Sequence, residues 1–280
     1  MLSLLTSDFD PVAEFTDFVN SPYVDLPGPL DINKGVVYLW ISAAVAILVP
    51  LLIIRGGLTS RPRRSQMFLE AVYDVAYNQV AKAGLPTEGM RIWFPYVATC
   101  FVFIWAMNVV GFIPLPFSGH RVDVFGLHLP KLEIYAASAN LSVALTLTLV
   151  TFFATHAEGI RYNGVRRYFK SWVPSGTPKL LLILLIPVEV LSQLVRLVSL
   201  SFRLFFNMLA GHLVIAVFLG VGALMAASLG NAVFAPVHLI GWGMGIALYL
   251  LEATLIAALQ AYIFAALSAL YIGGAIHPDH

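Results

Sequence analysis

The residues best suited to chemistry lie in one long apolar stretch, residues 180–276. Its ionisable side chains are Glu189, Arg196, Arg203, His212, His238 and Glu252. Glu189, Arg196 and Arg203 recur at intervals of seven residues, so on a helix they share one face. An isolated charge in apolar surroundings is costly, and such residues are therefore paired or functional. This pattern predicts a site that carries ions or protons.

Gln193 and Asn207 extend the polar face, because each lies four residues from a charged member of it. The face allows a structural interpretation, in which the charges pair and the two amides bond to neighbouring helices. Arg203 favours a functional one, because no acidic residue lies within seven positions of it. Its partner must therefore come from another helix or another chain.

His212 and Glu252 form a second group of candidates. His212 follows Arg203 by nine residues, which turns its side chain about half a turn away from Arg203 on a helix. It should therefore face the other helices, where Glu252, the one acid of the last apolar block, is its natural partner. An imidazole and a carboxylate together can relay protons near neutral pH. A core histidine bonded to a carbonyl oxygen is the alternative.

The weaker candidates are Gln193, Arg196, Asn108, Asn140, His238 and Tyr271. For Asn108, Asn140 and His238, ordinary polar contacts between helices explain the residues at least as well. No cofactor or metal is expected. The one cysteine, Cys100, lies in an apolar run, and the chain has no two-histidine metal motif, nucleophile elbow or phosphate-binding glycine loop.

Membrane helices must position these residues. The chain is 59% hydrophobic and 11% charged, with a mean hydropathy of +0.85, whereas about a quarter of the residues of a soluble protein are charged. The pattern predicts an all-α polytopic membrane protein with a single membrane domain, residues 1–280. The expected parts are an acidic non-cytoplasmic N-terminus (1–34), three spanning helices (35–54, 92–114 and 134–156), one surface amphipathic helix (62–84), and a long tilted two-helix C-terminal hairpin (178–228 and 233–275) broken near Gly230, Asn231 and Pro236.

The positions of the basic residues predict how the chain is oriented in the membrane. Basic residues cluster after the first span, between Arg55 and Arg64, and after the third, between Arg161 and Lys179, so both loops should be cytoplasmic. The first ten residues contain no basic residue and no long apolar core, so no cleaved signal peptide is expected. With a net charge of only +1, the chain has no strong positive potential that would attract nucleic acid, so nucleic acid is excluded as a partner.

Two segments resemble one known family. Val198-Ser-Leu-Ser-Phe-Arg-Leu-Phe-Phe-Asn-Met-Leu-Ala-Gly-His212 resembles the arginine-bearing helix of subunit a of F-type ATP synthases. Gln260-Ala-Tyr-Ile-Phe264 resembles the last helix of that family. The order of the expected elements agrees with the family over nearly the whole chain.

The resemblance implies a non-catalytic stator subunit that provides two proton half-channels, one from each membrane face. Arg203 would be the gate between them and would face a ring of rotor c subunits, each with one membrane-embedded carboxylate. The proton path would be lined by Glu189, Asn207, His212, Glu252 and Gln260.

The partners that the resemblance implies are the c ring, the b subunits of the peripheral stalk, the catalytic sector indirectly, and membrane lipid. It favours a bacterial inner membrane over the mitochondrial inner membrane. A secondary ion-coupled transporter is the alternative function, but it predicts internal repeats, and the sequence has none.

The last helix departs from the family pattern at one position. In mitochondrial-type members, a histidine at the position of His212 is matched by an acid on the last helix. That acid is expected seven residues before Gln260, at Ala253, whereas Glu252 lies eight before. One residue turns a side chain by about 100° on a helix, so we expect a local irregularity of this helix.

Overall fold

The structure is a computed structural model of the chain. It describes residues 22–24, 32–113, 121–124, 127–130, 136–172, 178–229 and 235–278, and among the helical residues it leaves out the side chains of 34, 179–180, 216, 219–229 and 235–240. The expected acidic segment 1–34 therefore falls almost wholly outside the described residues. So do Gly230 and Asn231 of the expected break, whereas Pro236 lies in the first turn of a helix, where proline is well tolerated.

Helices make up most of the described chain. They are α2 (Lys34–Arg55), α3 (Arg64–Asp74), the π-helix η2 (Val75–Ala81), α4 (Lys82–Gly84), α5 (Thr87–Gly111), the short 3-10 helix η3 (Ala137–Ala139), α6 (Leu141–Asn163), α7 (Val165–Lys170), α8 (Lys179–Leu229), α9 (Ala235–Leu251), the π-helix η4 (Glu252–Ile256) and α10 (Ala257–Ile276). The last three follow one another without a break. Two short antiparallel ribbons, which the sequence analysis did not expect, pair β1 (Pro22–Val24) with β2 (Ile32–Asn33) and β3 (Arg121–Val124) with β4 (Leu127–Pro130).

Five described helical segments are long and apolar enough to cross a membrane. They are Gly35–Arg55, Thr87–Gly111, Leu141–Asn163, Leu181–Ile215 and Gly241–Ile276. This confirms the predicted helical membrane class. The third begins seven residues later than the expected span 134–156, because η3 precedes it and the Asn140 side chain caps it by accepting a hydrogen bond from the Ser142 N–H at 2.9 Å.

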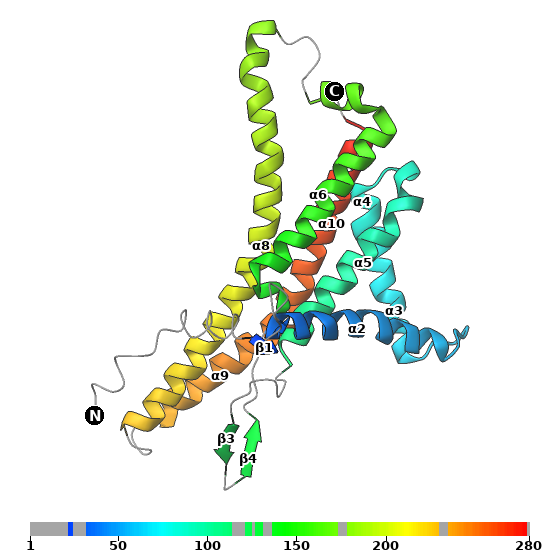
Figure 1. The fold of residues 1–280 in the computed structure, drawn as a ribbon. Coiled ribbons are helices and arrows are strands. Elements are labelled where there is room, and N and C mark those ends of the chain that lie inside the picture. The colour runs from blue at the N-terminus through cyan, green and yellow to red at the C-terminus, as the bar shows by residue number, and fades with distance from the viewer. Residues whose placement is uncertain are drawn as a thin grey trace.

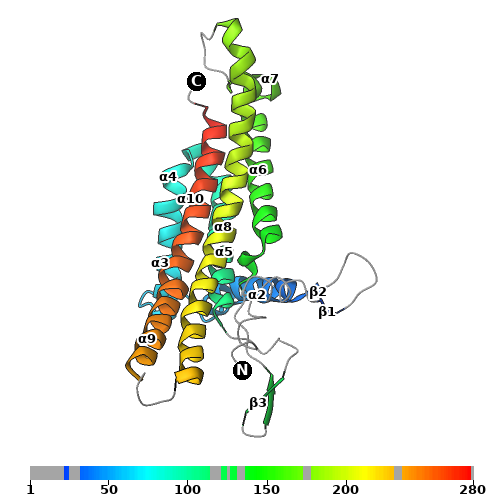
Figure 2. The ribbon, with the colours of Figure 1, turned by 90° about the vertical axis from the view of Figure 1, so that its left-hand side faces the viewer.

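The long helices have two directions. α5, α6, α8 and α10 run side by side along the length of the molecule, whereas α2 lies crosswise to them and packs against α5 (Figures 1 and 2). α3, η2 and α4 form a further continuous helical segment beside α5. Helices in these two directions cannot all lie along one membrane normal, so some of them must be steeply tilted in a bilayer.

The segment α3–η2–α4 is amphipathic. Ala76 and Val80 are buried on one face, where η2 packs against α5 and α10. On the other face Lys82 donates a hydrogen bond to Asn78, which in turn donates to Asp74. The polar face is therefore held together by neighbours one turn apart.

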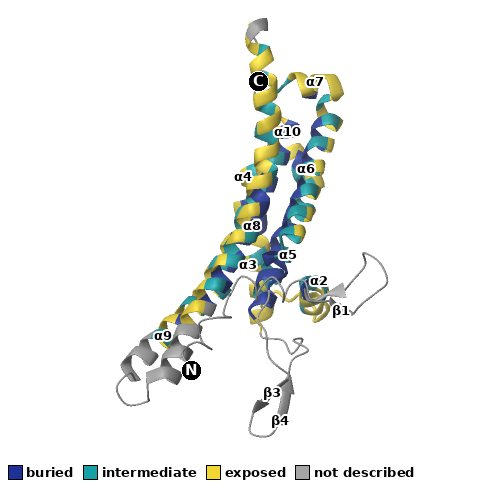
Figure 3. Cartoon of the chain, turned by 60° about the vertical axis from the view of Figure 1, so that its left-hand side comes forward, coloured by how far each residue is buried: buried dark blue, intermediate teal, exposed yellow. Residues whose placement is uncertain are grey.

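Close backbone contact brings α10 against the start of α5. Buried residues concentrate where α5, α6 and α10 meet, whereas much of α8 is exposed (Figure 3). Gly273 of α10 sits against the main-chain carbonyl of Gly84 in α4, and a Cβ atom at either position would overlap the opposite backbone. Glycine is required at both positions because the two helices touch without intervening side chains.

We predict that Gly273→Ala destabilises the protein, because the added methyl group must push α10 away from Gly84. Overpacking of this kind costs about 1–3 kcal/mol. The thermal midpoint of the purified protein should fall. The matched control is Gly274→Ala, because Gly274 has nothing within 4 Å of a built Cβ atom. An equal fall in the two variants would contradict the close contact.

Candidate functional site

Arg203 lies on the exposed face of α8. Its neighbours Phe202 and Phe206 are also exposed, so the guanidinium stands in an apolar surface. Within the part of the chain that the structure describes, Arg203 makes no hydrogen bond and no salt bridge. The spacing predicted that its partner does not lie on the same helix, and none is found among the described residues of the other helices either.

Three further polar residues of α8, Glu189, Gln193 and Arg196, contact one another or α10. Gln193 donates a hydrogen bond to Glu189 at 2.9 Å. The guanidinium of Arg196 lies 5.6 Å from the ring centroid of Tyr271, which is within the range of a cation–π interaction. None of the three α8 residues is fully buried.

Asn207 and Gln260 connect α8 to α10 one turn beyond Arg203. The Asn207 amide donates to the Gln260 side-chain oxygen at 3.1 Å. Gln260 is buried, and its own amide nitrogen has no hydrogen-bond partner among the described residues. The structure thus joins the two segments that carry the family resemblance.

His212 lies on a different face of α8 from Arg203, and it is buried. Its ring packs against Phe112 at the end of α5, with centroids 5.0 Å apart. The neighbouring Gly211 contacts the Glu252 carboxylate so closely that a Cβ atom at position 211 would overlap it. His212 and Glu252 are therefore brought to one place, although no direct hydrogen bond or salt bridge between them is found among the described contacts.

A π-helical turn accounts for the position of Glu252. The turn η4 begins at Glu252, and a π-turn holds one more residue than a regular α-helical turn. Glu252 lies eight residues before Gln260, and one of these eight is the extra residue of the π-turn. Glu252 therefore points in about the direction that a residue seven positions before Gln260 has in a regular α-helix, which is nearly the same face as Gln260. The irregularity expected from the one-residue offset is therefore present in the described chain.

Tyr249 and Phe112 complete this site and were missed by the sequence analysis. Tyr249 lies three residues before Glu252, and its hydroxyl donates to the Phe112 carbonyl oxygen. The two rings also meet edge to face, 5.6 Å apart. The spacing of three residues from an intramembrane acid is the signal that could have identified Tyr249.

The weaker candidates differ in their surroundings. Asn108 is buried, donates to the Ala257 carbonyl at 3.2 Å and accepts from the Ser138 hydroxyl at 2.7 Å. Asn140 caps α6. Both are fully explained by contacts between and within helices. His238 belongs to α9, but its side chain falls outside the described set.

Unpartnered polar atoms mark the site. Buried groups in proteins are nearly always hydrogen-bonded, so each exception needs an explanation. Five buried side-chain atoms have no partner among the described residues: Trp93 Nε1, Glu158 Oε1, His212 Nε2, Glu252 Oε2 and Gln260 Nε2. Three of the five belong to residues that the sequence analysis selected for the proton path.

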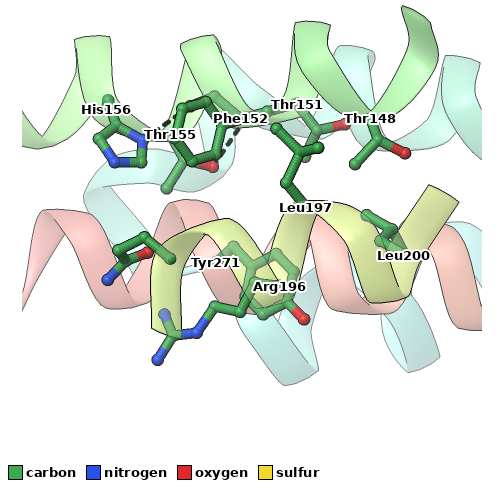
Figure 4. A pocket seen from close by; sticks show the side chains of 10 residues that line it. Thr148, Thr151, Phe152, Thr155, His156, Arg196, Leu197, Leu200 and Tyr271 are labelled. Atoms are coloured by element: carbon green, nitrogen blue, oxygen red, sulfur yellow. Dashed lines mark hydrogen bonds between the residues drawn. The ribbon is translucent and has the colours of Figure 1, made fainter. Parts of the chain in front are cut away.

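A small cavity lined by both polar and apolar side chains lies on the other side of Arg203, between α6, α8 and α10 (Figure 4). Its volume is about 20 Å³, enough for one water molecule. Gln193, Arg196 and Tyr271 line it together with residues that the sequence analysis missed: Thr148, Thr151, Thr155 and His156. The spacing of the threonines by three and four residues is the signal that places them on one face of α6.

Arg203 therefore stands between two polar sites along α8. The His212 site lies about 13 Å away toward the end of the helix, and Arg196 lies about 10 Å away in the opposite direction. The cavity side is nearer the basic segment of α7, which carries Arg166, Arg167 and Lys170. No cluster of metal-binding side chains is found among the described residues. The arrangement suits proton transfer at two places separated by a fixed positive charge.

Comparison with known proteins identifies the family. A family model described as the ATP synthase A chain matches residues 36–273. The ATP synthase subunit a of Bradyrhizobium diazoefficiens is 36% identical over 249 residues, which cover 86% of this chain and 88% of the relative. That of Rhodopseudomonas palustris strain HaA2 is 36% identical, with 86% and 87% covered, and that of Hyphomonas neptunium is 29% identical, with 96% and 97% covered. The chain therefore belongs to the ATP synthase A chain family.

Proposed function

We propose that the chain is the non-catalytic stator subunit through which protons cross the membrane sector of an F-type ATP synthase. Arg203 is the gate between two proton half-channels. The observation that carries this proposal is an arginine that has no partner among the described residues and is exposed on an apolar helix between two groups of polar residues. Family membership supports the role in ATP synthesis.

A permanent cation explains how the two half-channels stay separate. A rotor carboxylate that passes Arg203 is stabilised in its ionised form by the nearby positive charge. Protonated carboxylates are neutral and gain nothing from the cation, so protons do not slip directly between the half-channels. Each proton must then travel with the rotor. It supplies about 2.3 kcal/mol per 100 mV of membrane potential, so several protons are summed for each ATP.

The non-cytoplasmic half-channel ends at His212 and Glu252. His212 Nε2 and Glu252 Oε2 are both buried without a partner among the described residues, and the Glu252 carboxylate lies against Gly211, next to His212 in the chain, so water is the natural partner for both atoms. Asn207 and Gln260 continue the polar route from this site toward Arg203. The cytoplasmic half-channel includes the cavity lined by Gln193, Arg196 and Tyr271, with Glu189 one turn further out.

The length of α8 supports a tilted C-terminal hairpin beside the rotor. Its 51 residues extend about 76 Å, whereas the hydrocarbon core of a bilayer is about 30 Å thick. A steep tilt lets the exposed face of α8 follow the c ring over a long contact. The b subunits, the catalytic sector indirectly, and lipid are the other partners. The bacterial relatives favour a bacterial inner membrane.

The main test replaces Arg203 by lysine. Lysine keeps a positive charge but is a compact ammonium that loses its proton more readily when desolvated. We expect Arg203→Lys to abolish ATP-driven proton pumping in membrane vesicles, while the co-purified complex stays intact. Arg166→Lys, on the exposed face of α7, is the control and should pump normally. Normal pumping by Arg203→Lys would remove the proposed gate.

A second test exchanges the histidine and the acid. His212→Glu combined with Glu252→His keeps one imidazole and one carboxylate in the site, whereas each single change leaves two like groups. The double variant should therefore pump more protons than either single variant. Losses that simply add in the double variant would show that the residues do not act together.

A third test fills the space beside the Glu252 carboxylate. Gly211→Ala introduces a methyl group where the carboxylate lies, so the acid must move away from α8. Displacing a reacting group by about 1 Å can cost up to roughly a hundredfold in rate, so we expect pumping to fall by about tenfold or more. Gly243→Ala is the matched control, because nothing lies within 4 Å of its built Cβ atom. Equal pumping by the two variants would contradict this placement of Glu252.

A further inference from the structure

Glu158 of α6 is a buried acid that neither the sequence analysis nor the proposed path uses. It is only 2% exposed, and its Oε1 atom has no hydrogen-bond partner among the described residues. Its Oε2 atom lies 3.5 Å from Arg161, whose side chain is 65% exposed to the surroundings. A contact this long with a mobile surface cation offsets little of the cost of burying a carboxylate.

The face of α6 that carries Glu158 is the face that lines the cavity. Glu158 follows Thr151 by seven residues and Thr155 by three, so on a helix it continues their row. Thr148, Thr151 and Thr155 all line the cavity and are all buried. Glu158 is therefore the next member of this row toward the end of α6.

Glu158 and Glu189 both lie beyond the same end of the cavity between α6 and α8. The two helices run in opposite directions, because Thr148 and Leu200 lie at one end of the cavity and His156 lies at the other (Figure 4). From that first end, Glu158 is ten residues along α6 and Glu189 is eleven residues back along α8. These separations correspond to about 15 Å and about 16 Å along the two helix axes. Both acids therefore lie beyond the same end of the cavity, where α6 and α8 spread apart (Figure 1).

Tyr168 of α7 covers this end of the cavity. Its ring packs on Gly159, where a Cβ atom would overlap it, and lies edge-on to His156 with centroids 6.0 Å apart. Burial raises the pKa of the Tyr168 phenol, and the charges of Arg196 and Glu189 act on the same hydroxyl. α7 thus covers the end of α6 next to Glu158 and brings the Tyr168 hydroxyl within electrostatic range of Glu189 and Arg196.

We propose that Glu158 is a second proton-exchange residue of the cytoplasmic half-channel, in addition to Glu189. The Glu158 carboxylate takes a proton from hydronium in the cavity, which becomes water, and passes it as the carboxylic acid to water at the cytoplasmic surface; transfer in the other direction reverses these steps. Only O–H bonds form and break. The ionisable residues around this end are Arg161 and His156 on α6, Tyr168 on α7, Glu189 and Arg196 on α8, and Tyr271 on α10. This inference rests on the proposed function.

The test compares two substitutions at position 158 in the complete complex in liposomes, with ATP-driven acidification as the readout. Glu158→Gln keeps the size and hydrogen bonding but cannot exchange a proton, whereas Glu158→Asp keeps the acid and loses a methylene. General acid–base groups contribute a hundredfold or more, so we expect Glu158→Gln to slow proton transport by about tenfold or more. Glu158→Asp should retain most of it. A purely structural role predicts the reverse order, with the shorter side chain the more damaging.

The control is Arg161→Gln, which removes the long ion pair and should transport protons at the wild-type rate. A loss in Arg161→Gln equal to that in Glu158→Gln would assign Glu158 to the ion pair and overturn the inference. If Glu158→Gln fails to assemble, the pH profile of transport by Glu158→Asp decides, because moving an exchanging acid shifts the profile. An unchanged profile overturns the inference.

The outcomes separate this inference from the proposed function. Normal transport by Glu158→Gln together with no transport by Arg203→Lys would remove the role of Glu158 and leave the Arg203 gate in place. Normal transport by Arg203→Lys would remove the proposed function itself, and the role of Glu158 with it.

Discussion

The cost of holding the Arg203 guanidinium in an apolar helix constrains the rest of the structure. A charge at the centre of a bilayer costs about 3 kcal/mol on insertion scales. Within the described chain the polar groups of α8 bond elsewhere: Glu189 with Gln193, and Asn207, one turn from Arg203, with Gln260. Neither contact reaches the Arg203 guanidinium. The compensation for Arg203 must come from outside its own helix, which is what a passing rotor carboxylate supplies under the proposed function.

Tight helix packing fixes the two polar sites relative to that charge. Gly211 allows the Glu252 carboxylate to lie against α8, and Gly159 allows the Tyr168 ring to lie against α6. In both cases a glycine on one helix receives a functional or covering side chain from another element. The sites therefore depend on backbone positions as much as on the ionisable groups themselves.

Much of the fold could be predicted from the sequence because the length of an apolar stretch directly reflects the thickness of a bilayer. Helical spacing also separated Arg203 from His212, since an α-helix keeps a constant angle per residue over nine positions. The same rule predicted the irregularity at Glu252, which η4 supplies. For Asn108 and Asn140 the sequence analysis also allowed ordinary polar contacts. Their hydrogen bonds agree with this alternative, because Asn108 bonds to a neighbouring helix and Asn140 caps α6. The predicted start of α6 was seven residues too early, because the length of an apolar stretch does not show which residue caps the helix.

Contacts between helices could not be predicted in this way. The closeness of Gly211 to Glu252, of Tyr249 to Phe112, and of the α6 threonines to α8 depends on how elements far apart in the chain pack. Glu158 was overlooked for the same reason. It lies next to a basic segment in the sequence, and only the packing reveals that its carboxylate is buried.

The threonine hydroxyls of α6 limit the hydrogen bonds that this wall of the cavity can make. Thr148 and Thr155 each donate their hydrogen to the carbonyl four residues earlier, at 2.9 Å and 2.8 Å, so only their oxygen lone pairs remain for the cavity. The guanidinium of Arg196, which also lines the cavity, can only donate. A water that bridged these groups would point its hydrogens at the threonine oxygens and its oxygen at Arg196. These two threonines therefore offer no hydrogen-bond donor to an anion in the cavity.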